Sequence, residues 1–251
     1  MSLLAVIIPM YNEEFGAETC ITKVCEVLQN HLPESRLFVV NDGSQDNTLE
    51  ILYKIKSEHT DWQLEIVHSE KNRGYGGACL LGAQQALAKE FEYGLFMDSD
   101  LTNDPEMIPR FAEKLMDRRL DLLKASRYIP KGKMEGVPLH RQMISRYGNR
   151  VAEKLFGLGI RDCTNGFRAV RLSLIATEHF EERGFPSIME ELYILKIKGA
   201  RMGEIPYILT SRNDPRGTSF QYKPEIFRDY LKYAVKAFFV PYRPRQGDIH
   251  E

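Results

Sequence analysis

Two carboxylates that follow the apolar residues 95–97 are the strongest candidates for chemistry in this chain. Asp98 and Asp100 are one residue apart. Side chains alternate along a strand, so both point the same way if the apolar run is a buried strand. Converging carboxylates repel each other unless a cation lies between them. Oxygen ligands suit Mg²⁺ or Mn²⁺, and Mg²⁺ takes further ligands from substrate phosphates. The pair therefore predicts a metal bridge to a nucleotide diphosphate.

The alternative is an acidic loop whose side chains only cap the next helix. Asp104 directly precedes Pro105, which is the order typical of an N-cap and the first helical residue. Capping explains Asp104 but leaves Asp98 and Asp100 without a role, so we favour the metal.

Three more polar clusters follow apolar runs, at residues 11–14, 41–46 and 72–77. Arg73 beside a glycine-rich helix start suits a nucleotide phosphate or ribose, and Asp42 suits a base edge. Each cluster is also an ordinary turn signal. Together they favour a nucleotide site.

Cations gather in the second half of the chain. The loop at residues 127–136 is rich in Gly, Pro and Lys, and Arg141 and Ser145 fall four residues apart on one helix face. Arg127 and Arg141 suit an anionic acceptor; a solvated polar face is the alternative. Glu190 or Glu191 is the candidate for a carboxylate facing the same cleft.

Strands and helices alternate along the chain, which predicts an α/β fold with a parallel sheet. We expect strands at residues 5–9, 36–40, 64–67, 95–97, 121–126 and 204–209, and helices at 16–30, 48–58, 72–88, 105–119, 140–155, from 187, and at 224–240. Such sheets bind ligands beyond the carboxyl ends of their strands, where the acidic pair and the three polar clusters fall.

The last expected helix, residues 224–240, carries Arg228, Lys232 and Lys236 on one stripe and a broad apolar face opposite. Packing against the domain is the simpler interpretation. Docking on a membrane surface or on a membrane-protein partner is the alternative. No apolar run approaches the length of a membrane span.

Composition narrows the function classes. A chain of 251 residues can bury the core of one domain, and its formal net charge of −1 indicates no nucleic-acid partner. Its 4 cysteines lack metal-ligand spacing and are expected to be buried thiols in a reducing compartment. Without a signal-peptide pattern, we expect a cytoplasmic protein, or one attached peripherally to the cytoplasmic membrane face.

In this order the residues resemble the inverting family 2 glycosyltransferases of the GT-A fold, and most of all the polyprenyl-phosphate (dolichol-phosphate) mannosyl- and glucosyltransferases. The resemblance rests on VIIPMYNEE, VVNDGSQDNT, NRGYGGACLLG, FMDSDLTNDP, SRY followed by R-x-x-x-S, DCTNGFR, MEE and R-x-x-x-x-G-x-S. It implies a GT-A domain at residues 1–223, with a nucleotide half at about 1–104 and an acceptor half at about 105–223. An amphipathic helix and tail follow at 224–251.

The resemblance also implies roles for single residues. The nucleotide sugar would be held by Pro9, Tyr11, Glu13, Asp42, Arg73 and Asp98. Asp98 and Asp100 would hold Mg²⁺ or Mn²⁺. Acceptor phosphate and donor diphosphate would be handled by Arg127, Arg141, Ser145 and Arg212. Asn41 stands where relatives have the first of two aspartates, Thr102 where they have a metal-binding Gln, and Phe220 where a Lys is common.

The implied reaction moves a hexose from a GDP-mannose or UDP-glucose type of donor to a polyprenyl or dolichyl phosphate, with inversion. A phosphate monoester has a second pKa near ~6 and is already a nucleophile at neutral pH. A saccharide hydroxyl acceptor, the alternative, needs a base such as Glu190 or Glu191. A nucleotidyltransferase and a degenerate nucleotide-sugar-binding subunit are the two other hypotheses.

Overall fold

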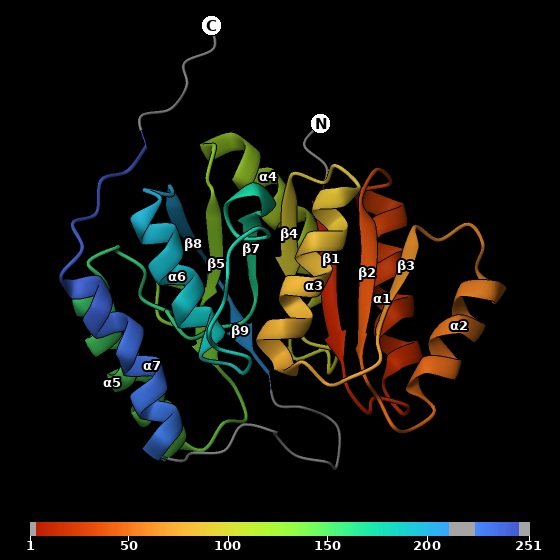
Figure 1. The fold of residues 1–251 in the computed structure, drawn as a ribbon, viewed down its shortest axis with the longest axis horizontal. Coiled ribbons are helices and arrows are strands. Elements are labelled where there is room, and N and C mark those ends of the chain that lie inside the picture. The colour runs from red at the N-terminus through yellow and green to blue at the C-terminus, as the bar shows by residue number, and fades with distance from the viewer. Residues whose placement is uncertain (1–3, 211–223, 246–251) are drawn as a thin grey trace, which may run out of the picture.

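One seven-stranded sheet, in the order β3-β2-β1-β4-β7-β5-β8, runs through the molecule with helices on both faces (Figure 1). The computed structural model describes residues 4–210 and 224–245, with the backbone alone for 224–227. The strands are β1 (Leu4–Met10), β2 (Arg36–Asp42), β3 (Leu64–Ser69), β4 (Tyr93–Phe96), β5 (Leu122–Ser126), β7 (Arg168–Arg171) and β8 (Met202–Pro206). β7 is antiparallel to β4 and β5, and the other pairs are parallel. The predicted α/β class with a mostly parallel sheet is confirmed.

The helices lie close to their predicted positions. They are α1 (Ala17–His31), α2 (Thr48–Glu58), α3 (Gly74–Ala88), α4 (Ile108–Arg118), α5 (Leu139–Phe156), α6 (Ser187–Ile197) and α7 (Pro224–Phe238), with short 3-10 turns η1 (Pro105–Met107) and η2 (Leu172–Leu174). None of the helices in these described ranges combines the length and apolar character needed to cross a bilayer.

Two expectations differ in detail from the structure. The edge strand expected at 204–209 is divided at Tyr207 into β8 and the short β9 (Ile208–Leu209). The loop expected at 127–136 contains β6 (Lys133–Met134), which pairs with β9 in a second small sheet. A two-residue strand carries too little periodicity to be recognised in the sequence.

The core has one apolar layer on each face of the sheet. Val6 and Ile8 of β1 pack on the face covered by α1, while Ala5 and Ile7 pack on the face covered by α3. All four are 0% exposed. A strand buried on both faces reads as a continuous apolar run, which is why the sequence indicated these strands clearly.

We expect one glycine substitution to show how tightly α3 packs on this sheet. A Cβ on Gly82 would lie 2.5 Å from Ile7 Cγ2, whereas a Cβ on Gly148 of α5 would meet nothing within 4 Å. Both glycines are inside helices, so both gain helix propensity as Ala. Gly82→Ala should lower the free energy of unfolding by about 1–3 kcal/mol, and Gly148→Ala should raise it by up to about 1 kcal/mol. Urea unfolding measures both, and equal shifts would contradict the close approach.

Candidate functional site

The two carboxylates lie in the loop that leaves β4 at the carboxyl edge of the sheet. Asp98 and Asp100 are partly exposed, while Ser99 between them is buried, which fits the predicted alternation. Asp100 Oδ1 accepts hydrogen bonds from the backbone nitrogen of Thr102 at 3.1 Å and from its Oγ1 at 2.7 Å. Leu101 between them has a φ of 57°. The loop therefore turns tightly around the Asp100 carboxylate.

Tyr207, which follows the edge strand β8, braces this loop. The Tyr207 hydroxyl donates to the backbone oxygen of Thr102 at 2.5 Å and accepts from Asn103 Nδ2 at 3.1 Å. Asn103 Oδ1 accepts from the backbone nitrogen of Asp98 at 2.7 Å. Thr102 and Asn103 are thus engaged in holding the loop. Asp104 accepts from the Glu106 nitrogen at 3.0 Å, so its predicted capping role is confirmed.

Asp42 and Arg73 lie together at the ends of β2 and β3, as expected. Asp42 is 3% exposed, and its Oδ1 accepts from the Arg73 backbone nitrogen at 2.7 Å. Arg73 Nε donates to Ser69 Oγ at 3.0 Å. Burial raises the pKa of Asp42, while the hydrogen bonds from the Arg73 and Gly74 backbone and the Arg73 charge oppose the rise.

The loop after β1 faces the same edge. Pro9 pairs with Val40 in the β1–β2 ladder, Tyr11 is 44% exposed, and the Glu13 nitrogen donates to Thr48 Oγ1 at 2.8 Å. The pKa of the Cys20 thiol on α1 is raised by burial and, after that, by the negative charges of Asp100, Glu13 and Asp98. The carboxylates of these three residues, which come from two loops, are therefore all within electrostatic reach of the Cys20 thiol.

Asn41, which stands where the resemblance implies an aspartate, is fully buried and precedes Asp42 in β2. Its Nδ2 lies 2.9 Å from His68 Nδ1. Its Oδ1 is the one buried side-chain oxygen or nitrogen that has no hydrogen-bond partner in the part of the chain that the structure describes. A buried acceptor without a partner is costly.

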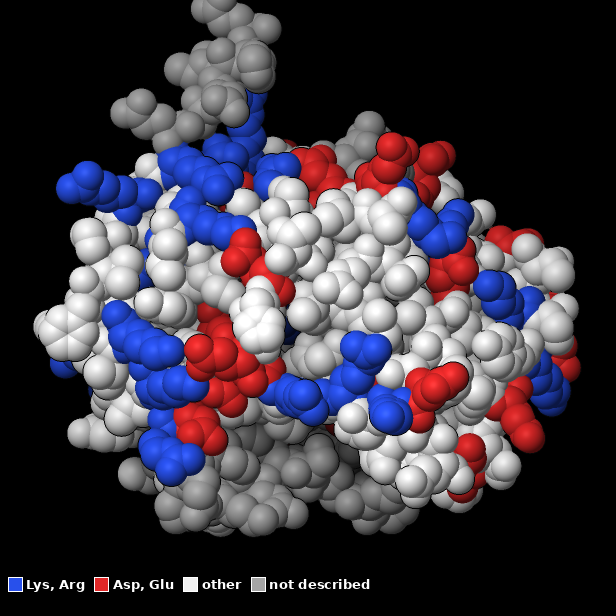
Figure 2. Space-filling view, viewed as in Figure 1, with Lys and Arg blue, Asp and Glu red and all other residues white. Residues whose placement is uncertain are grey.

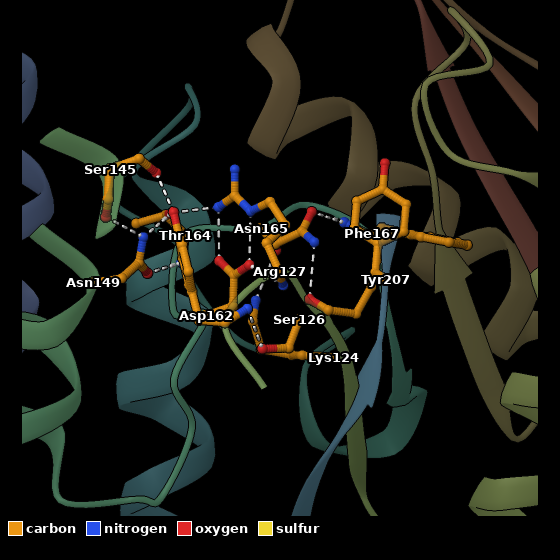
Figure 3. Close-up of polar contacts among 12 residues, drawn as sticks. Lys124, Ser126, Arg127, Ser145, Asn149, Asp162, Thr164, Asn165, Phe167 and Tyr207 are labelled. Atoms are coloured by element: carbon orange, nitrogen blue, oxygen red, sulfur yellow. Dashed lines mark hydrogen bonds and ion pairs between the residues drawn. The ribbon is translucent and has the colours of Figure 1, made fainter. Parts of the chain in front are cut away.

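The predicted acceptor side is organised by an ion pair (Figure 3). Arg127 Nε and Nη2 donate to the two Asp162 carboxylate oxygens at 2.7 Å each, and the Arg127 backbone nitrogen donates to Oδ2 at 2.9 Å. The side chains are 13% and 0% exposed. The Asp162 charge and these bonds raise the pKa of Arg127 against the opposing effect of burial, which is the largest influence on it. Arg127 is therefore held in one orientation.

Helix α5 is tied to this ion pair through side chains on one of its faces. Arg127 Nη2 also lies 3.3 Å from Thr164 Oγ1, which accepts from Asn149 Nδ2 at 3.0 Å. The Tyr128 hydroxyl donates to Ser145 Oγ at 2.7 Å. Asn149 Nδ2 also donates to the Ser145 backbone oxygen at 2.9 Å, so Arg127 and Ser145, both expected at the acceptor site, are linked through Thr164 and Asn149 (Figure 3).

Of the two remaining cations of the predicted acceptor site, the structure describes Arg141. Arg141 is half-buried in the first turn of α5, four residues before Ser145. Arg212 lies outside the residues that the structure describes.

A buried lysine holds the loop at residues 162–168 against β5. Lys124 is 0% exposed, and its Nζ donates to the Asn165 backbone oxygen at 2.7 Å. Asn165 Nδ2 donates to the Ala125 backbone oxygen at 2.8 Å (Figure 3). Burial, helped by the Arg168 charge, lowers the pKa of Lys124 to about 8. The DCTNGFR motif is therefore the element that joins β5, α5 and Arg127.

Tyr207 connects the acidic loop with Arg127, and so the two predicted parts of the site. Burial raises the pKa of its hydroxyl; the Asn103 hydrogen bond and the Arg127 charge lower it, and the charges of Asp98 and Asp100 raise it. The same phenol is thus within electrostatic reach of both the acidic pair and Arg127. No sequence pattern indicated a role for Tyr207, because its partners are 104 and 105 residues away.

Both glutamates considered as a base are already engaged. Glu191 forms a bidentate pair with Arg168 at 2.6 and 2.7 Å, with both side chains 3% exposed. Glu190 accepts from the backbone nitrogens of Glu181 at 2.8 Å and Glu182 at 2.9 Å. They support the fold around α6. The four cysteines are buried free thiols, as expected.

Comparison with known proteins identifies the family whose model this chain matches. Residues 5–177 match the model of the family described as Glycosyl transferase family 2. The chain is 31% identical over 209 residues to the undecaprenyl-phosphate mannosyltransferase of Micrococcus luteus, covering 82% of this chain and 83% of that protein. It is 29% identical to the dolichol-phosphate mannosyltransferase of Pyrococcus furiosus, covering 93% of this chain and 63% of that protein.

Solved structures share the fold. Glucosyl-3-phosphoglycerate synthase from Mycobacterium tuberculosis, in complex with Mn²⁺, UDP and glucosyl-3-phosphoglycerate, matches with a TM-score of 0.64 and 18% identity, over 96% of this chain and 81% of that one. S. aureus TarS 1-349 in complex with UDP-GlcNAc matches with a TM-score of 0.57 and 21% identity, over 93% and 66% of the two chains.

We expect Lys124 to impose a pH dependence on stability. Its pKa is about 8 in the fold against 10.5 as the ordinary value, so between these pH values the unfolded chain binds the proton that the folded chain releases. Stability from this group therefore rises with pH across that window, by on the order of 3 kcal/mol. Lys124→Met should remove the rise.

The measurement is urea unfolding at a series of pH values for the wild type, Lys124→Met and the exposed-site control Lys54→Met. The difference between the variants isolates Lys124 from other groups that titrate. Parallel stability curves for all three proteins would show that Lys124 has an ordinary pKa in the fold.

Proposed function

The chain belongs to glycosyl transferase family 2, and from that premise we propose that it moves a hexose from a nucleoside diphosphate sugar to a polyprenyl phosphate. The relatives named undecaprenyl-phosphate and dolichol-phosphate mannosyltransferase support this acceptor. We also propose the division into a nucleotide half at about residues 1–104 and an acceptor half at about 105–223.

One observation supports the phosphate acceptor most strongly. Glu190 and Glu191 are both held by hydrogen bonds to other residues, while the proposed acceptor side is rich in cations. A hydroxyl acceptor needs a base to remove its proton, and neither glutamate is available for that role, since buried hydrogen bonds hold both. A phosphate acceptor needs no base, because its second pKa near ~6 leaves it a dianion at neutral pH. It needs donors that bind and orient it.

Arg141, Ser145 and Arg212 would bind the acceptor phosphate, and Arg127 would position it. Two of the three Arg127 side-chain nitrogens are taken by Asp162, while Nη1 bonds to none of the described residues. Holding the acceptor oxygen in line with the anomeric carbon converts a bimolecular step into an effectively unimolecular one. Attack from the face opposite the leaving diphosphate inverts the anomeric configuration.

The acidic loop fits a divalent cation. It presents two carboxylates, the hard oxygen ligands of Mg²⁺ and Mn²⁺, on a loop that Tyr207 and Asn103 hold in place. Within the described ranges no group of three or more His, Cys, Asp or Glu residues forms a metal site, and Mg²⁺ binds through one or two carboxylates plus substrate phosphates. When bound, such an ion supplies charge neutralisation for the leaving diphosphate.

The nucleotide would lie over the ends of β1, β2 and β3, in contact with Pro9, Tyr11, Glu13, Asp42 and Arg73. The buried Asn41 Oδ1, which lacks a partner, supports this placement, because a ligand donor at the end of β2 would satisfy it. Arg73 at the start of α3 suits the ribose or phosphate.

We expect substitutions of Asp98 and Asp100 to lower activity, and a substitution of the neighbouring Asp104 to have little effect. Asp98→Asn and Asp100→Asn should each lower kcat by on the order of 10²–10³, because charge stabilisation at a leaving group is worth that much. Asp104→Asn is the matched control: Asn also caps helices well, so its activity should stay near that of the wild type. Initial rates with Mg²⁺ and with Mn²⁺ measure this, and equal losses in all three variants would contradict the metal role.

A transfer assay tests the proposal itself. We expect GDP-mannose or UDP-glucose with a polyprenyl phosphate to give a glycosylated lipid and free nucleoside diphosphate. Arg141→Ala and Ser145→Ala should raise the KM for the lipid phosphate about tenfold or more, since each removes a donor to a charged group, and leave the KM for the donor nearly unchanged. Release of pyrophosphate would indicate a nucleotidyltransferase. Transfer to a saccharide hydroxyl alone would overturn the phosphate acceptor.

A further inference from the structure

Helix α5 exposes large apolar side chains to solvent. Leu139 is 71% exposed, Met143 64%, Tyr147 74% and Ile144 44%. Residues four apart lie one above the other on a helix, so Leu139, Met143 and Tyr147 form one stripe, with Ile144 beside it. Most exposed apolar residues on proteins are scattered singly, whereas four within nine positions make a continuous surface.

The polar side of the same helix belongs to the candidate acceptor site. Arg141, Ser145 and Asn149 are also spaced by four and form a second stripe. Ser145 and Asn149 contact Tyr128 and Thr164. At about 100° per residue, the two stripes lie on different sides of α5. One helix therefore separates an apolar surface from the acceptor site by about one helix diameter.

The charge of this segment has one sign. Residues 139–152 contain Arg141, Arg146 and Arg150 and no Asp or Glu. Arg146 and Arg150 are exposed. Basic and apolar side chains interleaved on one helix face are the pattern of surfaces that bind anionic membranes.

Helix α7, where the sequence indicated docking on a membrane surface or membrane-protein partner, has a different balance. It buries Tyr233, Ala234 and Ala237 and exposes other apolar residues, among them Phe238. Its Lys232 pairs with Glu181 at 2.8 Å and Glu182 at 3.1 Å. On the face seen in Figure 2, blue and red side chains accordingly lie next to each other over α7. Membrane docking through residues 224–240 stays a prediction, and α5 has the stronger case.

We propose that Leu139, Met143, Ile144 and Tyr147, with Arg146 and Arg150, form a surface that docks on an anionic lipid bilayer. The inference rests on the proposed function and deepens it by naming the face that meets the membrane. Interfacial helices bury their apolar face about 5–10 Å deep, and a helix is about 10–12 Å wide. Docking thus brings Ser145 and Arg141 close to the height of lipid phosphates. A second copy of this chain fits less well, because two cationic faces repel each other.

The test is binding to vesicles without donor or acceptor. Sedimentation with vesicles of phosphatidylcholine mixed with phosphatidylglycerol should show binding of the wild type. The double variant Met143→Ser/Tyr147→Ser should lower the partition coefficient about tenfold or more, because it removes two large apolar side chains from the contact. The matched control Tyr53→Ser/Met116→Ser, which changes residues 53% and 43% exposed on α2 and α4, should bind like the wild type.

A charge variant tests the lipid headgroup. Arg150→Gln should weaken binding to the mixed vesicles about fivefold, the effect of one cation near an anionic surface. It should change binding to pure phosphatidylcholine little. Lys23→Gln, an exposed cation on α1, is the control and should leave both unchanged.

Three results would overturn the inference: no binding of the wild type, equal binding of the double variant, or a wild-type dimer in light scattering that the double variant abolishes while vesicle binding persists. A short-chain, water-soluble polyprenyl phosphate separates this failure from failure of the proposed function. Transfer to that acceptor without vesicle binding overturns docking alone. Vesicle binding without transfer to any polyprenyl phosphate overturns the proposed function alone.

Discussion

The bidentate ion pair between Arg127 and Asp162 is the interaction on which the proposed acceptor side depends. It joins the end of β5 to the 162–168 loop, and through Thr164 it fixes Asn149 on α5. Desolvation offsets much of the attraction in a buried pair, so its main effect is geometric. Loss of either partner would leave an uncompensated charge and release three segments at once. The position of Ser145 therefore depends on this ion pair through Asn149, in addition to its own hydrogen bond with Tyr128.

Arg168 of the neighbouring strand β7 forms a second buried ion pair with Glu191 of α6, and charges of both pairs act on the buried Lys124. The Arg168 charge lowers the pKa of Lys124, and the charges of Glu191 and Asp162 oppose that effect. These five groups comprise three basic and two acidic side chains. A surplus of basic groups beside the proposed acceptor residues would suit a dianionic phosphate.

The fold and the positions of the residues proposed for the donor were predictable because their signals are local. Continuous apolar runs marked the strands, and Asp42, Arg73 and the acidic pair follow directly from strand ends. The acceptor side was predictable in composition but not in pairing. Arg127 was expected to face a ligand, but its partner is 35 residues away, and periodicity carries no information at that range. Periodicity also located α5 without showing whether its apolar stripe meets the core or solvent, and it missed the antiparallel β7.

Thr102 limits what the acidic loop could offer a metal ion. The resemblance implies a metal-binding Gln at this position, whereas Thr102 donates its hydroxyl hydrogen to Asp100 Oδ1. That bond orients the carboxylate and withdraws part of its charge. Asn103 does not replace the amide, because Asp98 and Tyr207 occupy both ends of its side chain. An ion held by two carboxylates must complete its shell from water and diphosphate. Metal and nucleotide would then stabilise each other's binding, since reciprocity is required of any coupling between two ligands.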